Sequence, residues 1–224
     1  MRLEKTGACI AATPLYPEAS MNEDRFRLVI STSNQDKLRE VTEILSASWL
    51  ELVPFSSFSG APAPKEGSFS LEENALIKAR TARDFTGLPS VGDDTGLEVD
   101  ILDGKPGVFS SRYAGEKASY ADNVSKLLDV LQSIPRQERA ARFKCVVALA
   151  LPGGKEKLFR GYCWGHLCFE PKGDNGFGYD PVFVPNGKKS TLAQLSPSLK
   201  NKLSHRGKAL RSLKRHLRKM HEAP

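Results

Sequence analysis

Blocks of apolar residues alternate with segments of helical period through the first half of the chain. Residues 26–30 and 50–55 are predicted strands, and the segment between them carries apolar residues at helical spacing. Asn34 stands where that helix would begin and is a plausible N-cap. Ser70 and Glu73 form a capping box that opens a second predicted helix, which ends near Gly87.

Strands cluster in the second half of the chain. They are expected over 97–102, 142–151, 158–169 and 181–184, and Gly153 and Gly154 would turn the middle two into a hairpin. Residues 119–134 predict an amphipathic helix. One further helix begins at Pro197 and would carry both Lys200 and His205. The pattern predicts an α/β fold, with a mixed central β-sheet flanked by helices.

Length and composition set the number of domains. The chain has 224 residues, 40% hydrophobic and 26% charged, as expected for a globular protein. Residues 1–25 lack periodicity and predict a disordered N-terminal extension, which leaves 26–221 as a single domain. No stretch reaches the roughly 20 apolar residues of a membrane span, and the apolar run near the N-terminus is too short for a secretion signal. We therefore expect a cytoplasmic protein.

The net charge of +7 raises the possibility of nucleic-acid binding, but the charge is confined to one segment. Residues 197–224 hold nine Lys and Arg and one acid, a net charge of +8, so the remaining chain carries −1. The same segment has an apolar stripe of leucines, and no aromatic residue lies between Lys200 and Met220 to stack on bases. Nucleic-acid binding by this helix is therefore the alternative hypothesis, and we do not expect a nucleic-acid partner.

Asp93 and Asp94 are adjacent and have a glycine on each side, at what the pattern predicts to be a strand end. Adjacent carboxylates are costly unless a cation lies beside them. Aspartate and glycine are also ordinary turn residues, so a solvated turn is an equally good interpretation of this segment alone.

Each of the other candidate residues can be interpreted either as part of a binding site or as an ordinary surface or packing residue. Lys37 opposes the dipole of its helix unless an anion docks on the free backbone N–H groups there, and otherwise it is an exposed lysine. Glu66 and Lys78 are equally at home on a solvated surface, and Phe177 could pack beneath its own loop. His205 and Arg206 could belong to a charged face.

Taken together, six motifs in this order closely resemble the inosine triphosphate pyrophosphatase family, over about Leu28 to Leu217. The motifs are Thr32-Ser33-Asn34 with Lys37; Leu71-Glu72-Glu73-Asn74-Ala75 with Lys78-Ala79; Asp93-Asp94-Thr95-Gly96-Leu97; Pro106-Gly107 with Ser111-Arg112-Tyr113-Ala114-Gly115; Gly176-Phe177-Gly178-Tyr179-Asp180-Pro181; and Ser204-His205-Arg206-Gly207.

The resemblance implies a fold, a reaction and a cofactor. It implies an active-site cleft between two lobes, and hydrolysis of ITP, dITP and XTP to the monophosphate and pyrophosphate, which cleanses the nucleotide pool. It also implies a Mg²⁺-dependent hydrolase acting on acid anhydrides, which forms a homodimer. A sensor that binds the nucleotide without turnover would not need the acidic residues.

The resemblance also assigns residues to roles. Asp94 would be the catalytic proton acceptor and, with Glu66, a magnesium ligand, while Asp93 and Arg112 would support them. The residues expected to bind substrate are Thr32, Ser33, Asn34, Gln35, Asp36, Lys37, Lys78, Thr95, Phe177, Gly178, Tyr179, Asp180, Lys200, His205 and Arg206. Gln194 stands where the family usually has glutamate, and Thr95 where it usually has serine.

Overall fold

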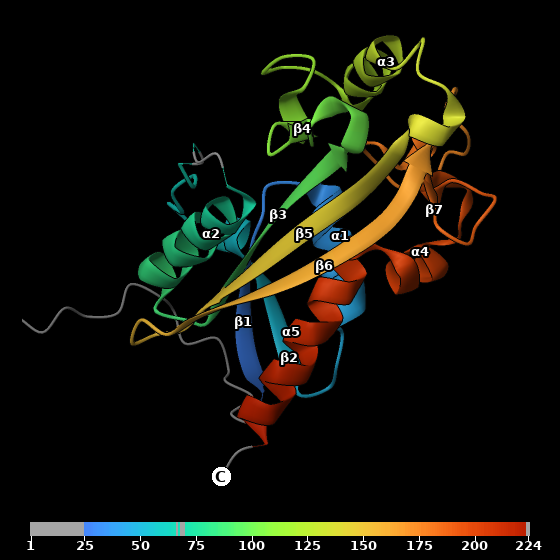
Figure 1. Ribbon diagram of the computed structural model, residues 1–224. Helices are drawn as coiled ribbons and strands as arrows, with labels where there is room; N and C mark the ends of the chain where they lie inside the picture. Colours follow the sequence, from blue (N-terminus) through green and yellow to red (C-terminus); the bar gives the residue numbers. More distant parts are fainter. Residues whose placement is uncertain (1–24, 66, 68–69, 223–224) are drawn as a thin grey trace, which may run out of the picture.

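The computed structural model describes residues 25–65, 67 and 70–222 (Figure 1). Within these ranges seven strands form one sheet, in the order β2-β1-β3-β5-β6-β7 with β4 beside β3. β1 pairs in parallel with β2 and β3, and the other pairs are antiparallel, which confirms the predicted mixed sheet. The strands are β1 (Phe26–Ser31), β2 (Leu50–Pro54), β3 (Ser90–Val99), β4 (Pro106–Gly107), β5 (Ala140–Ala150), β6 (Glu156–Leu167) and β7 (Phe183–Pro185).

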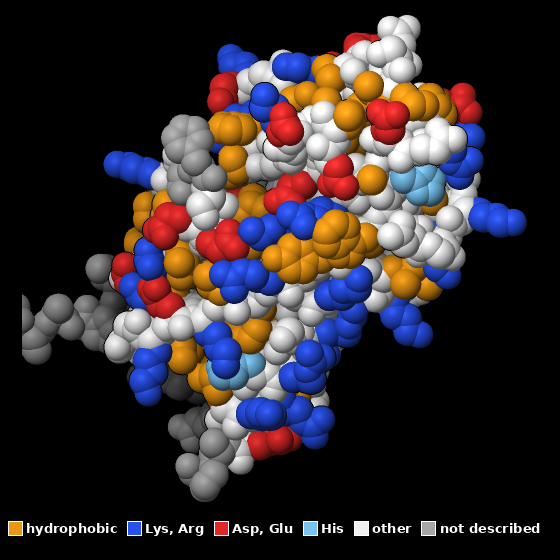
Figure 2. All heavy atoms as spheres, viewed as in Figure 1, with side chains coloured by type: hydrophobic (Ala, Val, Ile, Leu, Met, Phe, Trp, Pro, Cys, Tyr) orange, Lys and Arg blue, Asp and Glu red, His pale blue; other side chains and the backbone are white. Residues whose placement is uncertain are grey.

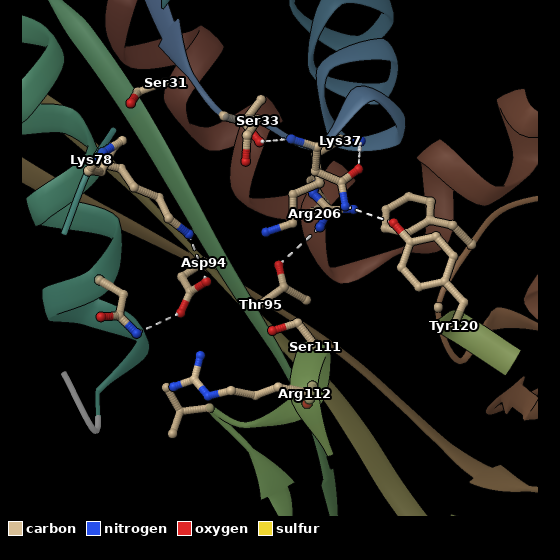
Figure 3. A pocket seen from close by; sticks show the side chains of 18 of the residues that line it. Ser31, Ser33, Lys37, Lys78, Asp94, Thr95, Ser111, Arg112, Tyr120 and Arg206 are labelled. Atoms are coloured by element: carbon tan, nitrogen blue, oxygen red, sulfur yellow. Dashed lines mark hydrogen bonds and ion pairs between the residues drawn. The ribbon is translucent and has the colours of Figure 1, made fainter. Parts of the chain in front are cut away.

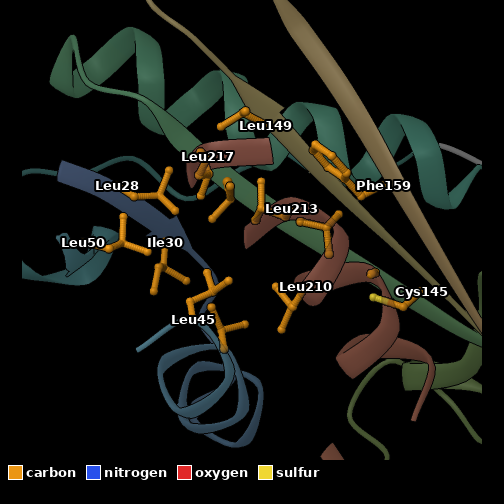
Figure 4. Close-up of a cluster of buried hydrophobic side chains, with 14 residues drawn as sticks. Leu28, Ile30, Leu45, Leu50, Cys145, Leu149, Phe159, Leu210, Leu213 and Leu217 are labelled. Atoms are coloured by element: carbon orange, nitrogen blue, oxygen red, sulfur yellow. The ribbon is translucent and has the colours of Figure 1, made fainter. Parts of the chain in front are cut away.

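Helices cover both faces of the sheet (Figure 1). They are α1 (Gln35–Leu45), α2 (Leu71–Thr86), α3 (Tyr120–Val130), α4 (Pro197–Leu203) and α5 (His205–His221). Alternate residues of β5 show the layering, because successive side chains of a strand point to opposite faces. Val146 and Ala148 pack with α2, while Cys145 and Val147 pack with the leucines of α1 and α5 (Figure 4).

The predicted strand over 97–102 begins too late. β3 already starts at Ser90, so Asp93 and Asp94 lie in the middle of a ten-residue strand and not at its end or in a turn. The neighbouring glycines are required for close packing. A Cβ on Gly92 would lie 2.5 Å from the Lys78 Cβ, and one on Gly96 would lie 2.5 Å from the Gly107 carbonyl oxygen.

The prediction of a single C-terminal helix from Pro197 is wrong, because Ser204 interrupts the helix and divides it into α4 and α5. This residue has extended backbone angles (φ −64°, ψ 157°) and caps α5 by accepting a hydrogen bond from the Gly207 N–H at 3.0 Å. Lys200 therefore lies on α4, while His205 opens α5. After the break, the first turn of α5 lies against the polar middle of β3, where Arg206 contacts Asp93 and Thr95.

The expected N-terminal extension lies outside the described residues except for Arg25. None of the helices in the described ranges is both long and apolar enough to cross a membrane.

Candidate active site

A cavity of about 510 Å³ opens beside the middle of β3 (Figure 3). Its walls come from the N-terminus of α1, from α2, from the 3₁₀ turn Ser110–Arg112 with α3, and from the starts of α4 and α5. The volume is in the range typical of small-molecule sites. The predicted cleft therefore exists, and most of the expected binding residues line it.

Asp94 projects into this cavity from the α2 face of β3. Lys78 Nζ lies 3.0 Å from its Oδ1, and the Asn74 side-chain amide donates to its Oδ2 at 3.2 Å (Figure 3). Lys78 also donates to the Asp93 carbonyl oxygen at 3.1 Å. Two side chains one turn apart on α2 thus hold the carboxylate of Asp94 in place.

Asp93 points to the opposite face of β3, because neighbouring residues of a strand alternate. Its Oδ2 lies 3.1 Å from Arg206 Nε and 3.3 Å from Lys37 Nζ. Burial alone would raise the pKa of Asp93, but Lys37, Arg206 and Lys78 outweigh it and hold the pKa well below its usual range. The two aspartates therefore have separate environments, and only Asp94 lines the cavity.

The start of α1 differs from the prediction of free backbone N–H groups. Asn34 Oδ1 accepts from the N–H groups of both Asp36 and Lys37 at 3.0 Å, so these donors are already paired. Lys37 lines the cavity with Thr32, Ser33 and Asn34, whereas Gln35 and Asp36 do not. Asn34 and Lys37 therefore line the cavity, while the Asp36 and Lys37 N–H groups are taken up by the N-cap.

A buried ionic cluster lies behind the cavity. Glu40 receives Lys200 Nζ at 2.6 Å and Arg206 Nη1 at 2.5 Å, and Lys200 also contacts Asp180. Burial would raise the pKa of Glu40, but the two cations lower it overall. Sequence reasoning missed Glu40, although its position three residues after Lys37 puts both on one side of α1.

Arg206 is held on three sides. Besides Glu40 and Asp93, it donates to the Thr95 hydroxyl at 3.1 Å. Burial tends to lower the pKa of Arg206, yet Asp93 and Glu40 raise it above its usual value, so the guanidinium is permanently charged. The hydroxyl of Thr95, at the position that usually holds serine, is part of this network.

His205 also lines the cavity, stacked on Phe143 with ring centroids 4.5 Å apart. Burial lowers the pKa of His205 well below its usual range, and Arg206 and Lys200 add to the effect. The imidazole is therefore neutral, with one donor and one acceptor nitrogen. Its Nδ1 has no hydrogen-bond partner among the described residues.

The glycine-rich loop supplies an aromatic wall. Phe177 lines the cavity with Lys200 Nζ 4.6 Å and the Arg206 guanidinium 5.3 Å from its ring centre. Asp180 accepts from the Phe177 N–H at 2.9 Å and also holds Lys200, so its carboxylate fixes the loop. Gly176 must lack a side chain, because a Cβ there would lie 2.2 Å from an Asp180 oxygen.

The remaining expected residues have mixed outcomes. Tyr179 and Gly178 line the cavity, and the Tyr179 hydroxyl donates to the Ser110 carbonyl oxygen at 2.9 Å. Arg112 also lines it, beside Phe109. Glu66 lies outside the described residues. Gln194, at the position where the resemblance led us to expect glutamate, completes a capping box with Thr191.

Tyr120 is a cavity residue that sequence reasoning missed. It opens α3, and its hydroxyl accepts a hydrogen bond from Asn34 Nδ2 at 2.8 Å (Figure 3). Partial burial, with Asp36 nearby, raises the pKa of Tyr120, so the phenol stays protonated. No motif marks this position, because its role depends on α3 packing opposite α1.

These features define a class of protein: an α/β protein with one cavity that is lined by a carboxylate, lysines, an aromatic ring and a neutral histidine. Such a cavity matches a nucleotide with charged phosphates and a flat base. Comparison with known proteins agrees. The model of the Ham1 family matches residues 28–216, and the chain belongs to this family.

Similar proteins match along nearly their whole length. A dITP/XTP pyrophosphatase of Geobacter sulfurreducens is 49% identical over 85% of this chain and 96% of its own, and one of Vibrio parahaemolyticus is 44% identical over 84% and 94%. The structure of a HAM1 protein from Coxiella burnetii superposes with a TM-score of 0.79 at 40% identity, over 87% of this chain and 99% of its own. The predicted family and α/β fold are confirmed.

Proposed function

We propose that this protein hydrolyses the triphosphates of non-standard purines, ITP, dITP and XTP, to the monophosphate and pyrophosphate. The observation that carries the proposal is the placement of Asp94 between Lys78 and Asn74 in a cavity that Phe177 and neutral His205 also line. The dITP/XTP pyrophosphatases among its relatives, alike over nearly their full length, support the same reaction.

The phosphate end is built for a highly charged ligand. Lys37 and Lys78 face the cavity, and Asn34 Nδ2 and the Ser33 hydroxyl add neutral donors. A triphosphate buried without cations would be strongly destabilised, whereas charge-assisted hydrogen bonds from lysines offset its desolvation.

Asp94 acts as the proton acceptor in the proposed reaction. A water oxygen forms a bond to the α-phosphorus, the bond from that phosphorus to the bridging oxygen breaks, and pyrophosphate leaves. The proton of the water passes to a carboxylate oxygen of Asp94. Lys78, which touches the same carboxylate, keeps it oriented and balances the charge of the phosphates.

A magnesium ion held by few protein ligands is part of the proposal, and the described residues hold no group of three or more His, Cys, Asp and Glu side chains that could bind it. Magnesium commonly uses only one or two protein carboxylates and completes its shell with water and phosphate oxygens. Asp94 supplies one such carboxylate, and Glu66, outside the described residues, is the second candidate. When bound, the ion would neutralise phosphate charge and polarise the phosphoryl oxygen.

In this proposal, the hydrogen-bond donors of His205 and Arg206 select the base. Hypoxanthine and xanthine carry a 6-oxo acceptor where adenine carries an amino donor. The neutral His205 offers one N–H, and Arg206 uses three of its N–H groups within the protein, which leaves two. An adenine amino group facing these donors would stay unpaired, which disfavours ATP.

The direct assay incubates purified protein and magnesium with ITP or with ATP and detects pyrophosphate. We expect pyrophosphate from ITP at a far higher rate than from ATP. The absence of pyrophosphate from ITP would exclude the proposal.

Lys and Arg side chains gather over α5 (Figure 2), but several of them are engaged within the protein. Lys208, Arg211 and Lys214 donate to the carbonyl oxygens of Tyr162, Asn201 and Ser46, respectively, and the leucines of α5 lie in the core. This arrangement gives nucleic-acid binding no specific support. A cytoplasmic location and a homodimer remain part of the proposal, and sedimentation of the pure protein tests the dimer.

A further inference from the structure

Tyr120 contacts two other residues that line the cavity, Asn34 and Phe177. Its hydroxyl accepts from Asn34 Nδ2 at 2.8 Å and lies 3.5 Å from an Asp36 carboxylate oxygen. Its ring lies against Phe177, with centroids 5.8 Å apart and planes inclined by 38°. Tyr120 thus uses the amide proposed to face the phosphates and the ring proposed to face the base.

A ligand that stacks on Phe177 must displace one of the side chains that now contact its ring. Lys200 and Arg206 lie over its ring, but both are buried and ion-paired with Glu40. Displacing either cation would break a buried ion pair, which is strongly unfavourable. Tyr120 is 42% exposed and is held by the hydrogen bond from Asn34, a long hydrogen bond to Asp36 and one ring contact, with no buried ion pair. It is the neighbour of Phe177 that can leave at least cost.

A base stacked on Phe177 needs the place that the Tyr120 ring now takes. Two stacked aromatic groups require ring centres within about 7 Å of each other, and a third ring does not fit between Tyr120 and Phe177 at their present separation. Asn34 Nδ2 has two N–H groups and directs one of them at the Tyr120 hydroxyl, so a ligand oxygen that accepts this N–H must likewise replace the hydroxyl.

We propose that Tyr120 is a specificity-determining gate, which occupies the Asn34 and Phe177 contacts of the nucleotide until a ligand displaces it from both. This inference rests on the proposed function, because it assumes a ligand with phosphates at one end and a base at the other. A whole nucleotide regains both contacts, whereas a phosphate or a base alone regains only one. The gate therefore favours intact nucleotides over their fragments.

The test measures binding of two fragments, inorganic tripolyphosphate and inosine, by titration calorimetry. The variants are Tyr120→Phe, which removes the hydroxyl, and Tyr120→Ala, which removes the ring as well. Val130→Ala, at the exposed far end of α3 and outside the cavity, is the matched control. Thermal unfolding of each variant checks that it is folded.

Tripolyphosphate needs only the hydroxyl to leave Asn34, so both Tyr120 variants should bind it more tightly by the same factor, about twofold to tenfold. Inosine needs the ring to leave too. Tyr120→Phe should therefore tighten inosine binding by a similar factor, and Tyr120→Ala by about a further twofold to tenfold. Val130→Ala should match the wild type with both probes.

Weaker binding in the Tyr120 variants would show that Tyr120 contacts the ligand, and unchanged binding would show that it obstructs nothing; either result overturns the gate. The proposed function is tested separately by pyrophosphate release from ITP. A wild-type protein that releases pyrophosphate, with no tightening in the variants, contradicts the gate alone. A wild-type protein that releases none contradicts the proposed function.

Discussion

Glu40 is the centre of the buried cluster, and its replacement by glutamine gives the sharpest stability prediction. The substitution keeps the shape of the side chain but removes the charge that faces Lys200 at 2.6 Å and Arg206 at 2.5 Å. Removing one partner of a buried ion pair costs about 3–5 kcal/mol. The remaining amide oxygen still accepts one hydrogen bond, so we expect a loss near the lower limit, about 3 kcal/mol at neutral pH.

This loss should depend on pH. The pKa of Glu40 is lowered in the folded protein, so its carboxylate stabilises the fold above the unfolded-state value near 4.5, and that contribution disappears as the pH falls through the folded-state pKa. A protonated Glu40 is neutral, as glutamine is. The difference between Glu40→Gln and the wild type should therefore shrink as the pH falls below about 4.5.

Thermal and urea unfolding at several pH values measure the effect. In a chain of this length, about 3 kcal/mol corresponds to a fall in Tm of roughly 6–12 °C. Glu43→Gln, on the exposed side of α1, is the control and should change stability by less than about 0.5 kcal/mol. Equal stability of Glu40→Gln and wild type at neutral pH, or a difference that persists undiminished in acid, would refute this reasoning.

Three other substitutions test the site. Gly92→Ala places a Cβ 2.5 Å from the Lys78 Cβ, so it should lower the free energy of unfolding by about 1–3 kcal/mol, and an unchanged Tm would contradict this packing. Lys78→Met removes the cation beside Asp94 and should reduce kcat/KM for ITP by about 100-fold, with the fold intact by circular dichroism; undiminished turnover would separate Lys78 from the reaction. His205→Ala should reduce the preference for ITP over ATP by about tenfold or more while tripolyphosphate binding is kept, and an unchanged preference would remove His205 from base selection.

Local patterns predicted the elements whose signals are local. The N-cap Ser70, which accepts from the Glu73 N–H, the hairpin around Gly153 and the N-cap Asn34 are present in the structure, while the Glu73 carboxylate pairs with Arg80. The strand carrying Asp93 and Asp94 was misjudged, because its glycines resemble a turn but serve contacts with α2 and β4 that are distant in sequence. The break at Ser204 was missed because the leucine stripe continues across it.

The site residues also divide into those that a local motif marks and those that only the folded structure identifies. Motif residues such as Asp94, Lys78 and His205 could be named from the sequence, and the structure brings them to one cavity. Glu40 and Tyr120 could not, because a buried glutamate is recognised only by the cations around it and Tyr120 only by its neighbours across the cavity. Gln35 and Asp36 were also expected to bind substrate, but they are not among the residues that line the cavity.

The most direct measurement of the central claim is the position of attack. Hydrolysis of ITP in water enriched in ¹⁸O, followed by mass spectrometry of both products, identifies the phosphorus that the water attacks. Attack on the α-phosphorus beside Asp94 predicts the label in inosine monophosphate and unlabelled pyrophosphate, with turnover strongly reduced in Asp94→Asn. Label in pyrophosphate, or undiminished turnover in Asp94→Asn, would contradict the account.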